Sequence, residues 1–393
     1  MSEAKAGHQV INTQDNRLDI FVEACLANLP SKRITKDITI AHCCAIKNLT
    51  INGAFRGILT AGCSADIVID NVIIDDVCYT ISSDGSNPNY SIIVTNSTLN
   101  GWTSVSNASV AEATFENCKF GKSNRGEGLT DYAYFRPYCA TTISGAETTF
   151  ADGFKVDANN ANITIAAEVP AEQVAKLALE EDCKLVENAD GSRTICAKVY
   201  VVRIGEAKYE SLQEACAAAQ TGDTIVLLDD VTIAAEIATI YSNGQAYTGI
   251  KVAEGITIDG AGHTLTVTGA AGNTWSSAIY MTGGAVKNLT IAGGNIDRIV
   301  AVSHTACIVT GNVNVQMTGG SAYSLIGGSG GNGNAQGDIQ LTMTGGTVAQ
   351  VFGANEGGSY TGNVTVKLQG GTITRRFLGG CYNNFTGTFA SAN

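Results

Sequence analysis

The stretch Ile46-Lys47-Asn48-Leu49-Thr50-Ile51 decides the fold expected for this chain. Its letters predict a short strand, a corner at Asn48 and a second short strand. Asparagine suits a corner because it tolerates the left-handed backbone, and its amide is expected to bond the asparagine of the next turn. Similar words place Asn71, Asn96 and Asn117 at steps of 23, 25 and 21 residues: IVIDNVII at 67–74, IIVTNSTL at 92–99 and ATFENCKF at 113–120. A repeat of this length, made only of strands and corners, predicts a solenoid.

The apolar residues alternate within each word. Ile67 and Ile69 precede the corner, Val72 and Ile74 follow it, and alternation places all four on the inner face. Ordering a coil costs about 1.5 kcal/mol per residue in conformational entropy, and the apolar burial within one coil of about 23 residues does not offset that cost. Coils must therefore stack to fold. The word KNLTI returns letter for letter at residues 287–291, which indicates that the chain uses the motif twice.

Length and composition agree with a β-rich repeat protein. The chain has 393 residues, too long for one compact core, which predicts two or more domains. It contains 45 glycines and 4 prolines, and 15% of its residues are charged, as expected for an all-β protein with tight corners. A hydrophobic content of 44% excludes general disorder.

Four segments are expected along the chain. Residues 1–30 form an N-terminal cap region, with an amphipathic helix over 17–29 that covers the open end of the first coil. Residues 31–165 form a first parallel β-helix array. Residues 166–222 form a small α+β connector with a second cap helix, and residues 223–393 form a glycine-rich second array.

The connector is assigned from local signals. Pro170 opens a helix that is expected to run to about Glu181. The letters NADG at 188–191 lie between two apolar runs and predict a hairpin. Ser211 and Glu214 form a capping-box pattern, which predicts the second cap helix.

The charge pattern excludes several classes of partner. The formal net charge is −12 and no basic run exists, so no nucleic-acid partner is expected. No apolar stretch reaches 18 residues, so no membrane span is expected either. The N-terminal letters contain no apolar segment typical of a secretory signal.

Several segments resemble known proteins. The coils resemble right-handed parallel β-helices of the pectate-lyase-like superfamily. KYESLQEACAAAQTGDTIVLLDDVTI at 208–233 resembles the connector between β-helix arrays in repetitive surface proteins of anaerobic gut bacteria, as do the segments at 152–165 and 183–195. The coils that end in GG, such as NVNVQMTGG at 312–320, resemble the glycine-rich repeats of those proteins. The resemblance implies a secreted or cell-surface structural or adhesion module.

Many β-helix proteins cleave polysaccharides, so catalysis is the alternative function: a polysaccharide lyase or a glycoside hydrolase. Hydrolysis requires two carboxyl groups across the scissile bond, and Asp75-Asp76 is the strongest candidate pair. Adjacent residues of a strand point to opposite faces, so one of the two must lie at a bend. The Gly-His-Gly and Arg-x-Lys patterns of polygalacturonase-like enzymes are missing, which favours a module without catalytic residues.

The aromatic segment at 131–138 is the main candidate for ligand binding. Tyr132 and Tyr134 share one face of an expected strand, and Arg136 follows them. Flat aromatic faces beside an arginine suit stacking on the sugar rings of a polysaccharide or a host glycan. The alternative is that these rings fill the interior of a coil or cover a seam.

The cysteines and histidines do not indicate a metal or redox site. The 12 cysteines contain no CxxC pair and are expected to be reduced, small buried hydrophobes. The four histidines lack the spacing of a metal site, and neither a metal nor a cofactor is expected.

The final letters, NNFTGTFASAN at 383–393, contain no signal for a cap. An uncapped β-helix end presents unpaired backbone groups and apolar core. We therefore expect this chain to be a piece of a longer repetitive protein, and expect it to self-associate through its C-terminal face when expressed alone.

Overall fold

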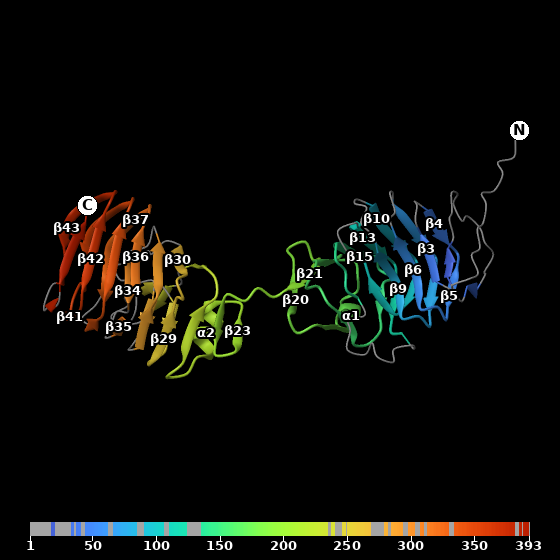
Figure 1. The fold of residues 1–393 in the computed structure, drawn as a ribbon, viewed down its shortest axis with the longest axis horizontal. Helices are drawn as coiled ribbons and strands as arrows, with labels where there is room; N and C mark the ends of the chain where they lie inside the picture. Colours follow the sequence, from blue (N-terminus) through green and yellow to red (C-terminus); the bar gives the residue numbers. More distant parts are fainter. Residues whose placement is uncertain are drawn as a thin grey trace, which may run out of the picture. The chain divides into compact units, whose positions relative to one another are not determined.

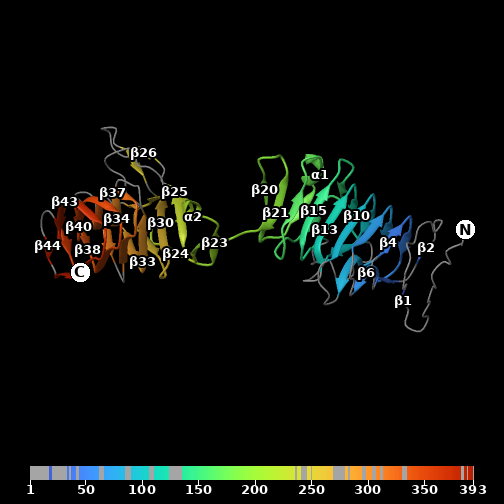
Figure 2. The ribbon, with the colours of Figure 1, turned by 90° about the horizontal axis from the view of Figure 1, so that it is seen from above.

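The computed structural model divides into two compact units, Met1–Lys198 and Val199–Asn393 (Figure 1). It describes residues 17–19, 33–34, 37–40, 44–61, 66–84, 90–105, 110–123, 135–234, 237–239, 246–248, 250–268, 279–281, 284–293, 298–302, 307–309, 313–329, 334–381, 385–386 and 388–392. Both units are almost entirely β, and each is a solenoid in which successive turns of the chain add parallel strands to the same sheets (Figure 2). The expected all-β fold and parallel coils are confirmed.

The first unit winds around three main sheets, whose strands pair in parallel except for the last two strands of the second sheet. The first sheet has the order β1 (Arg17–Asp19), β3 (Asp37–Ile40), β6 (Arg56–Ala61), β9 (Tyr79–Asp84) and β12 (Trp102–Ser104). The second has the order β4 (Cys44–Lys47), β7 (Ile67–Asp70), β10 (Tyr90–Thr95), β13 (Val110–Glu116), β15 (Ala140–Ser144), β18 (Ile163–Ile165), β21 (Arg193–Ala197) and β20 (Cys183–Glu187). The third has the order β2 (Arg33–Ile34), β5 (Thr50–Asn52), β8 (Ile73–Asp75), β11 (Thr98–Asn100), β14 (Lys119–Gly121) and β16 (Thr149–Phe150).

The predicted asparagine corners join the second sheet to the third. Asn48, Asn71, Asn96 and Asn117 all have positive φ, between 50° and 54°. The amide of Asn71 donates to Oδ1 of Asn48 at 2.7 Å, which confirms the expected bond between successive corners at this step. Asn96 instead donates to Oδ1 of Asp70 at 3.0 Å, so the ladder of amides does not continue unchanged.

Asp70 binds side chains from both neighbouring coils. Its Oδ1 accepts a hydrogen bond from the Thr95 hydroxyl at 2.8 Å, and its Oδ2 lies 3.5 Å from Nζ of Lys47. The bonds from Asn96 and Thr95, together with the Lys47 charge, hold the pKa of Asp70 below its usual value. This outer polar column ties three coils together above the buried strands.

Side chains of the first unit alternate as predicted around its core. Ile67, Ile69, Val72 and Ile74 are fully buried. Toward the C-terminal end of the unit, phenylalanine rings fill the coil interior at centroid distances of 5.2 to 6.0 Å: Phe115, Phe120, Phe135, Phe150 and Phe154.

The end of the first unit differs from the predicted connector. The hairpin is confirmed: β20 and β21 pair antiparallel around residues 188–191, and β21 closes the edge of β18. The helix from Pro170 is only one turn long, α1 (Ala171–Val174), so the prediction that it reaches Glu181 is wrong. Instead β19 (Leu177–Leu179) pairs in parallel with β17 (Phe154–Val156). Pairing with the preceding coil outweighs the local helical pattern.

The second unit begins with its own cap. Ser211 precedes α2 (Leu212–Ala218), and its Oγ accepts a hydrogen bond from the backbone N–H of Glu214 at 3.2 Å, as the capping pattern predicted. The boundary between the units, after Lys198, falls within the segment that the sequence assigned to a connector. The expected domain boundaries themselves stay a prediction.

Three larger sheets carry the second unit. The first has the order β23 (Ala207–Tyr209), β22 (Val202–Ile204), β24 (Thr224–Leu227), β29 (Ile256–Asp259), β32 (Gly284–Lys287), β35 (Cys307–Val309), β38 (Ala335–Gln336), β41 (Tyr360–Thr361) and β44 (Phe385–Thr386). The second has the order β25 (Val231–Ala234), β30 (Thr264–Thr268), β33 (Leu289–Gly293), β36 (Val313–Met317), β39 (Ile339–Met343), β42 (Val364–Leu368) and β45 (Phe389–Ala392). The third has the order β34 (Arg298–Val302), β37 (Ser321–Ser329), β40 (Thr347–Phe352) and β43 (Thr372–Leu378). Two strand pairs complete it: β26 (Ile237–Thr239) with β27 (Ala246–Thr248), and β28 (Ile250–Val252) with β31 (Ile279–Met281).

The lysine of the repeated word KNLTI again pairs with an aspartate one coil away, here in the preceding coil. Asn288 has a φ of 49°, and Nζ of Lys287 lies 3.1 Å from Oδ2 of Asp259 in the preceding coil. Burial acts to raise the pKa of Asp259, but hydrogen bonds from the Ala261 N–H, Lys287 and Asn288 outweigh it and lower the pKa. The recurrence of the letters therefore reflects a recurring bond between an outer lysine and an aspartate one coil away.

The N-terminal cap helix expected over 17–29 does not begin where the sequence placed it. Arg17–Asp19 form β1, which pairs in parallel with β3, and the rest of 17–29 lies outside the described residues. Pairing with a neighbouring coil again decides the conformation of a short segment. In the described part of the chain, neither helix has the length and apolar character needed to cross a membrane.

Candidate functional site

The two candidate carboxylates lie at the end of a strand and at the bend that follows it. Asp75 ends β8, and its Oδ1 accepts a hydrogen bond from the amide of Asn100 at 3.0 Å. Asp76 has a φ of 52° and forms the bend that the sequence argument required of one member of the pair. The two residues therefore do not belong to one strand: Asp75 ends β8, and Asp76 forms the bend after it. Ligand binding by either residue stays a prediction.

Arg136 is held in place by an acidic partner. Its Nε lies 3.1 Å from Oδ2 of Asp157, whose side chain is 10% exposed. Its guanidinium carbon also lies 5.5 Å from the centre of the Tyr138 ring, close enough for a cation–π contact. Tyr132 and Tyr134, the two aromatic residues proposed with Arg136, lie outside the described residues.

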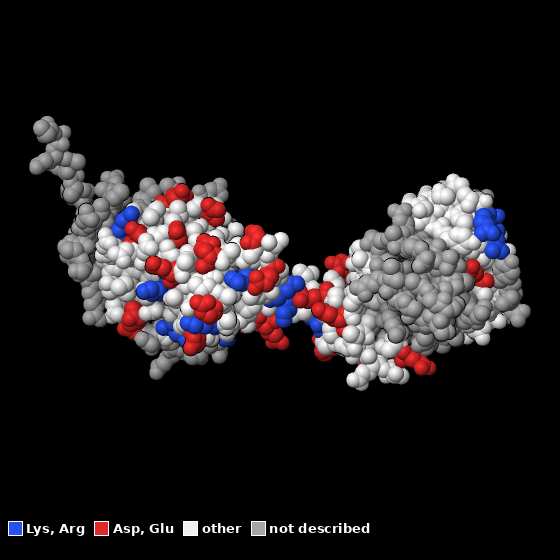
Figure 3. Space-filling view, turned by 180° about the vertical axis from the view of Figure 1, so that it is seen from behind, with Lys and Arg blue, Asp and Glu red and all other residues white. Residues whose placement is uncertain are grey.

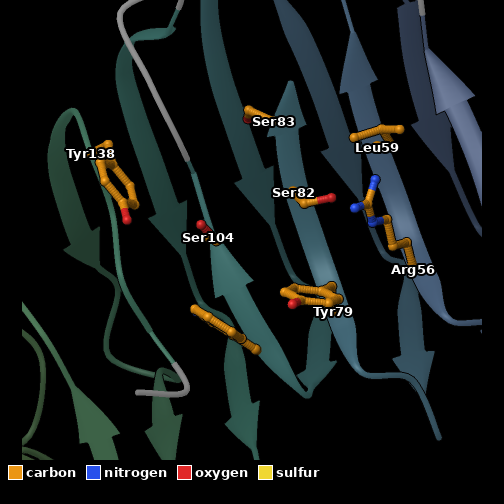
Figure 4. A pocket seen from close by; sticks show the side chains of 8 residues that line it. Arg56, Leu59, Tyr79, Ser82, Ser83, Ser104 and Tyr138 are labelled. Atoms are coloured by element: carbon orange, nitrogen blue, oxygen red, sulfur yellow. The ribbon is translucent and has the colours of Figure 1, made fainter. Parts of the chain in front are cut away.

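A hollow on the outer side of the first sheet brings together aromatic, hydroxyl and cationic side chains (Figure 4). Its volume is about 280 Å³, near the lower limit of about 300 Å³ for pockets that bind small molecules. We call it the first-sheet pocket. It is lined by Arg56, Leu59, Tyr79, Ser82, Ser83, Trp102, Ser104 and Tyr138.

The register of the strands forms the aromatic wall of the first-sheet pocket. Arg56 of β6 and Trp102 of β12 are each the direct partner of Tyr79 in β9. Neighbouring strands lie about 4.8 Å apart, so side chains at partner positions stack. The rings of Tyr79 and Trp102 are 5.0 Å apart at 27°, and the Arg56 guanidinium carbon lies 5.8 Å from the centre of the Tyr79 ring.

An irregularity in β9 turns a hydroxyl into the pocket. Trp102 pairs with Tyr79, but two residues later Ser104 pairs with Ser82. Over this span β9 therefore contains one more residue than β12. Thr80 and Ile81 are both buried, and the strand turns outward again at Ser82. Bulges of this kind commonly redirect a side chain beside a binding site.

The Ser82 hydroxyl is an unusual group. The residue is 9% exposed, and its Oγ is buried with no hydrogen-bond partner among the described residues. A buried hydroxyl without a partner costs about 1–3 kcal/mol. The neighbouring Ser83, by contrast, accepts a hydrogen bond from the Thr60 hydroxyl at 3.0 Å. A polar ligand in the pocket could form a hydrogen bond with the Ser82 hydroxyl.

Tyr138 forms the far wall of the first-sheet pocket. The segment that carries it continues the sheet, because the Arg136 N–H donates to the Thr103 carbonyl at 2.9 Å and the Tyr138 N–H donates to the Val105 carbonyl at 2.7 Å. The Tyr138 ring is 38% exposed and lies beside the Arg136 guanidinium. One of the residues selected from the sequence, Arg136, therefore supports a wall of the pocket.

The residues at the centre of this site were not predicted from the sequence. Arg56, Tyr79 and Trp102 occupy equivalent positions in three successive coils, and each step is 23 residues. Arg56 and Tyr79 each lie eight residues after an asparagine corner, Asn48 or Asn71, but Trp102 lies six residues after Asn96. Aligning the coils on their corners would therefore have joined only Arg56 and Tyr79, and the place of Trp102 in the column is set by the strand register.

The described lining of the first-sheet pocket offers groups for ligand binding. Aromatic faces, hydroxyls and one guanidinium line it, and no acidic residue is among its described lining. Within the described ranges, no group of three or more His, Cys, Asp or Glu residues is placed to hold a metal ion.

Comparison with known proteins adds no relative. No protein-family model, curated protein or solved structure gives a significant match to this chain. The β-solenoid is established by the structure, whereas membership of the pectate-lyase-like superfamily, and likeness to surface proteins of gut bacteria, stay predictions.

Proposed function

We propose that this chain is a non-catalytic, carbohydrate-binding solenoid module that acts outside the cell, either secreted or at the cell surface. The observation that carries the proposal is the stacked pair Tyr79 and Trp102, which forms an aromatic wall beside the hydroxyls of Ser82 and Ser104 and the guanidinium of Arg56. The extracellular location rests on the sequence resemblance alone.

Sugars match such a wall in two ways. A pyranose ring has an apolar face of C–H groups, which packs on an aromatic ring, and a rim of hydroxyls, which require polar partners. In the first-sheet pocket the rings of Tyr79 and Trp102 can pack on the apolar face of a sugar, and the hydroxyls of Ser82 and Ser104 can bond to its hydroxyl groups. The volume of about 280 Å³ is near the lower limit for small-molecule pockets, so the expected ligand is small, on the order of one or two sugar rings.

The position of the carboxylates favours binding over cleavage. A glycosidase needs two carboxyl groups that face the same bond, about 5–10 Å apart. Asp75 is engaged by Asn100, Asp76 lies at the adjoining bend, and neither lines the first-sheet pocket. The pocket therefore holds the ligand-binding groups without the pair that hydrolysis requires.

The test is a panel of immobilised polysaccharides assayed for retention and for release of reducing or unsaturated ends. We expect retention without release, and we expect Trp102→Ala and Tyr79→Ala each to weaken retention by about tenfold or more, as for a central aromatic contact. Tyr323→Ala is the matched control, because Tyr323 is also exposed beside an arginine, Arg375, but lies in the second unit.

Two results contradict the proposal. Release of new chain ends by the purified protein, abolished in Asp75→Ala, would establish catalysis instead. Equal retention by the wild-type protein and the Trp102→Ala variant would place any binding outside the first-sheet pocket. Far-UV spectra and unfolding midpoints of each variant separate loss of the site from loss of the fold.

A further inference from the structure

One hydroxyl of the first-sheet pocket differs from the other buried hydroxyls of its unit. Ser82 is almost fully buried, and its Oγ has no hydrogen-bond partner among the described residues. In the described part of the first unit, the other buried serine and threonine side chains each have a partner within the protein: Thr60, Thr80, Ser83, Ser97, Thr103, Thr141 and Thr148. A buried polar group without a partner is rare in folded proteins and calls for an explanation. Here the exception is a residue that lines the pocket.

The neighbours of Ser82 explain why this bond is missing. In its row, Leu59 of β6 lies on one side and Ser104 of β12 on the other. Leu59 has no hydrogen-bonding side chain, and Figure 4 shows the Ser82 hydroxyl pointing away from Ser104, toward the side on which Leu59 and Arg56 lie. The extra residue of β9 places the hydroxyl there, because it returns the strand to its outer face after two buried residues.

The row of Ser82 lies about one sugar ring away from the aromatic wall. Trp102, in the wall, and Ser104, the partner of Ser82, are two residues apart in β12, which corresponds to about 6.6 Å along the strand. A sugar ring packed beside Trp102 therefore brings its hydroxyl groups to the row of Ser82. A serine hydroxyl turns about a single torsion, so it reaches such a group without movement of the backbone.

The charges near the pocket do not single out a ligand. On the face of the first unit that Figure 3 shows, acidic and basic side chains are interspersed, so no field of one sign covers that face. The one cationic residue in the described lining, Arg56, is engaged within the protein: its guanidinium carbon lies 5.8 Å from the centre of the Tyr79 ring, and it has a further interaction. Hydrogen bonding is therefore the property of the pocket that distinguishes one ligand from another.

We propose that Ser82 determines the specificity of the first-sheet pocket, which selects saccharides with a free hydroxyl group at the ring position that faces Ser82. A sugar ring in the pocket excludes water, so the Ser82 hydroxyl bonds to the ligand or stays unpaired. A site that buries a polar group in this way rejects an analogue without the matching hydroxyl far more strongly than an apolar pocket rejects a missing methylene. This inference rests on the carbohydrate binding proposed above.

The experiment measures binding of methyl glucoside, methyl galactoside and methyl mannoside, and of their monodeoxy analogues, each of which lacks one hydroxyl. The fluorescence of Trp102, in a Trp275→Phe background, reports binding. We expect a glycoside to bind, and one of its monodeoxy analogues to bind about tenfold or more weakly. In Ser82→Ala we expect the glycoside to bind about tenfold more weakly than before and the same analogue to bind as well as its parent, since the two changes remove one bond.

The stability of the free protein gives a second readout, of opposite sign. Removing a buried hydroxyl without a partner removes the cost of leaving it unpaired, so Ser82→Ala is expected to raise the urea midpoint by about 0.3 M or more. Ser97→Ala is the matched control, because Ser97 is a buried serine of the same unit outside the described lining. Its Oγ donates to the Thr95 carbonyl at 2.7 Å and accepts from the Val72 N–H at 3.0 Å. This variant should lower the midpoint and leave glycoside binding unchanged.

The outcomes distinguish this inference from the function on which it rests. Equal binding of a glycoside and all its monodeoxy analogues, or a preference that survives in Ser82→Ala, would overturn it. A midpoint lowered in Ser82→Ala as in Ser97→Ala would also overturn it, because the hydroxyl would then have a structural role. Retention of a polysaccharide without binding of any glycoside would overturn this inference alone, since the proposed selection acts on a single sugar ring. If no polysaccharide is retained and no glycoside binds, both proposals are wrong.

Discussion

Replacing Asn71 by alanine and by glycine measures how far one left-handed corner contributes to the fold. Asn71 has a φ of 52° and an exposed side chain whose amide donates to Oδ1 of Asn48 at 2.7 Å. Its backbone N–H donates to the Thr95 carbonyl at 3.1 Å, and both variants keep that bond. The variants therefore lose the same amide contact and differ only in how easily the backbone adopts the corner.

The magnitude follows from two opposing contributions. Alanine held in the left-handed region costs about 1–2 kcal/mol, which glycine avoids. Glycine in turn loses about 0.5–1 kcal/mol more than alanine through the greater freedom of the unfolded chain. At residue 71 we therefore expect the glycine variant to be more stable than the alanine variant by about 0.5–1 kcal/mol.

Asn100 is the matched control for this corner. Its amide also donates one hydrogen bond, to Asp75 at 3.0 Å, but Asn100 ends β11 and has no positive φ. In ordinary strand geometry the order reverses, and alanine should be more stable than glycine by about 0.5–1 kcal/mol. The test is therefore whether the difference in stability between the alanine and glycine variants has opposite signs at Asn71 and Asn100.

The assay is urea unfolding followed by fluorescence of Trp102, in a Trp275→Phe background so that the signal reports the first unit alone. With a slope of about 1–3 kcal/mol per molar urea, the expected differences shift the midpoint by about 0.2–1 M. If alanine is at least as stable as glycine at residue 71, or if both sites give the same order, the corner does not depend on its backbone conformation as argued.

Three further predictions concern stability and reactivity. Hydrogen bonds lower the folded-state pKa of Asp70 and Asp259, so the unfolded chain binds more protons in acid; their stabilisation should be lost as pH falls below about 4, and Asp70→Asn should flatten the midpoint-versus-pH curve there. Ile69 is fully buried, so Ile69→Ala should lower the free energy of unfolding by about 2–5 kcal/mol in urea titrations, and Ile69→Val by no more than about 1.5 kcal/mol. Burial raises the pKa of the Cys118 and Cys216 thiols to about 12, so peptide mass spectrometry should find both unmodified by iodoacetamide at pH 8 until the chain unfolds.

The sequence predicted those parts of the fold that a few residues decide. A corner in the left-handed region favours glycine, asparagine and aspartate over other residues, so the positions of Asn48 and Asn71 marked turns of the first unit. Alternation marked Ile67 and Ile69 as inner residues for a similar reason, because one face of each strand is closed to water.

The sequence failed where distant pairing decides the outcome. The pattern after Pro170 indicates a helix, but residues 177–179 form β19, because β17 offers a complete set of backbone partners one coil away. The local pattern of residues does not indicate that β17 will lie beside this segment. The same limit applies to Arg17–Asp19, which the sequence assigned to a helix and the structure places in β1.

The first-sheet pocket was hidden for a related reason, and the reason bears on how a solenoid acquires a binding site. Strand register fixes columns of residues across coils, and the inner columns must stay apolar: Ile58 and Ile81 are partners, and both are fully buried. The outer columns carry no such demand, so a single column can hold Arg56, Tyr79 and Trp102 without disturbing the core. The residues of such a site come from successive coils and are not consecutive in the sequence. The site leaves no contiguous motif, and its residues become neighbours only when the coils stack.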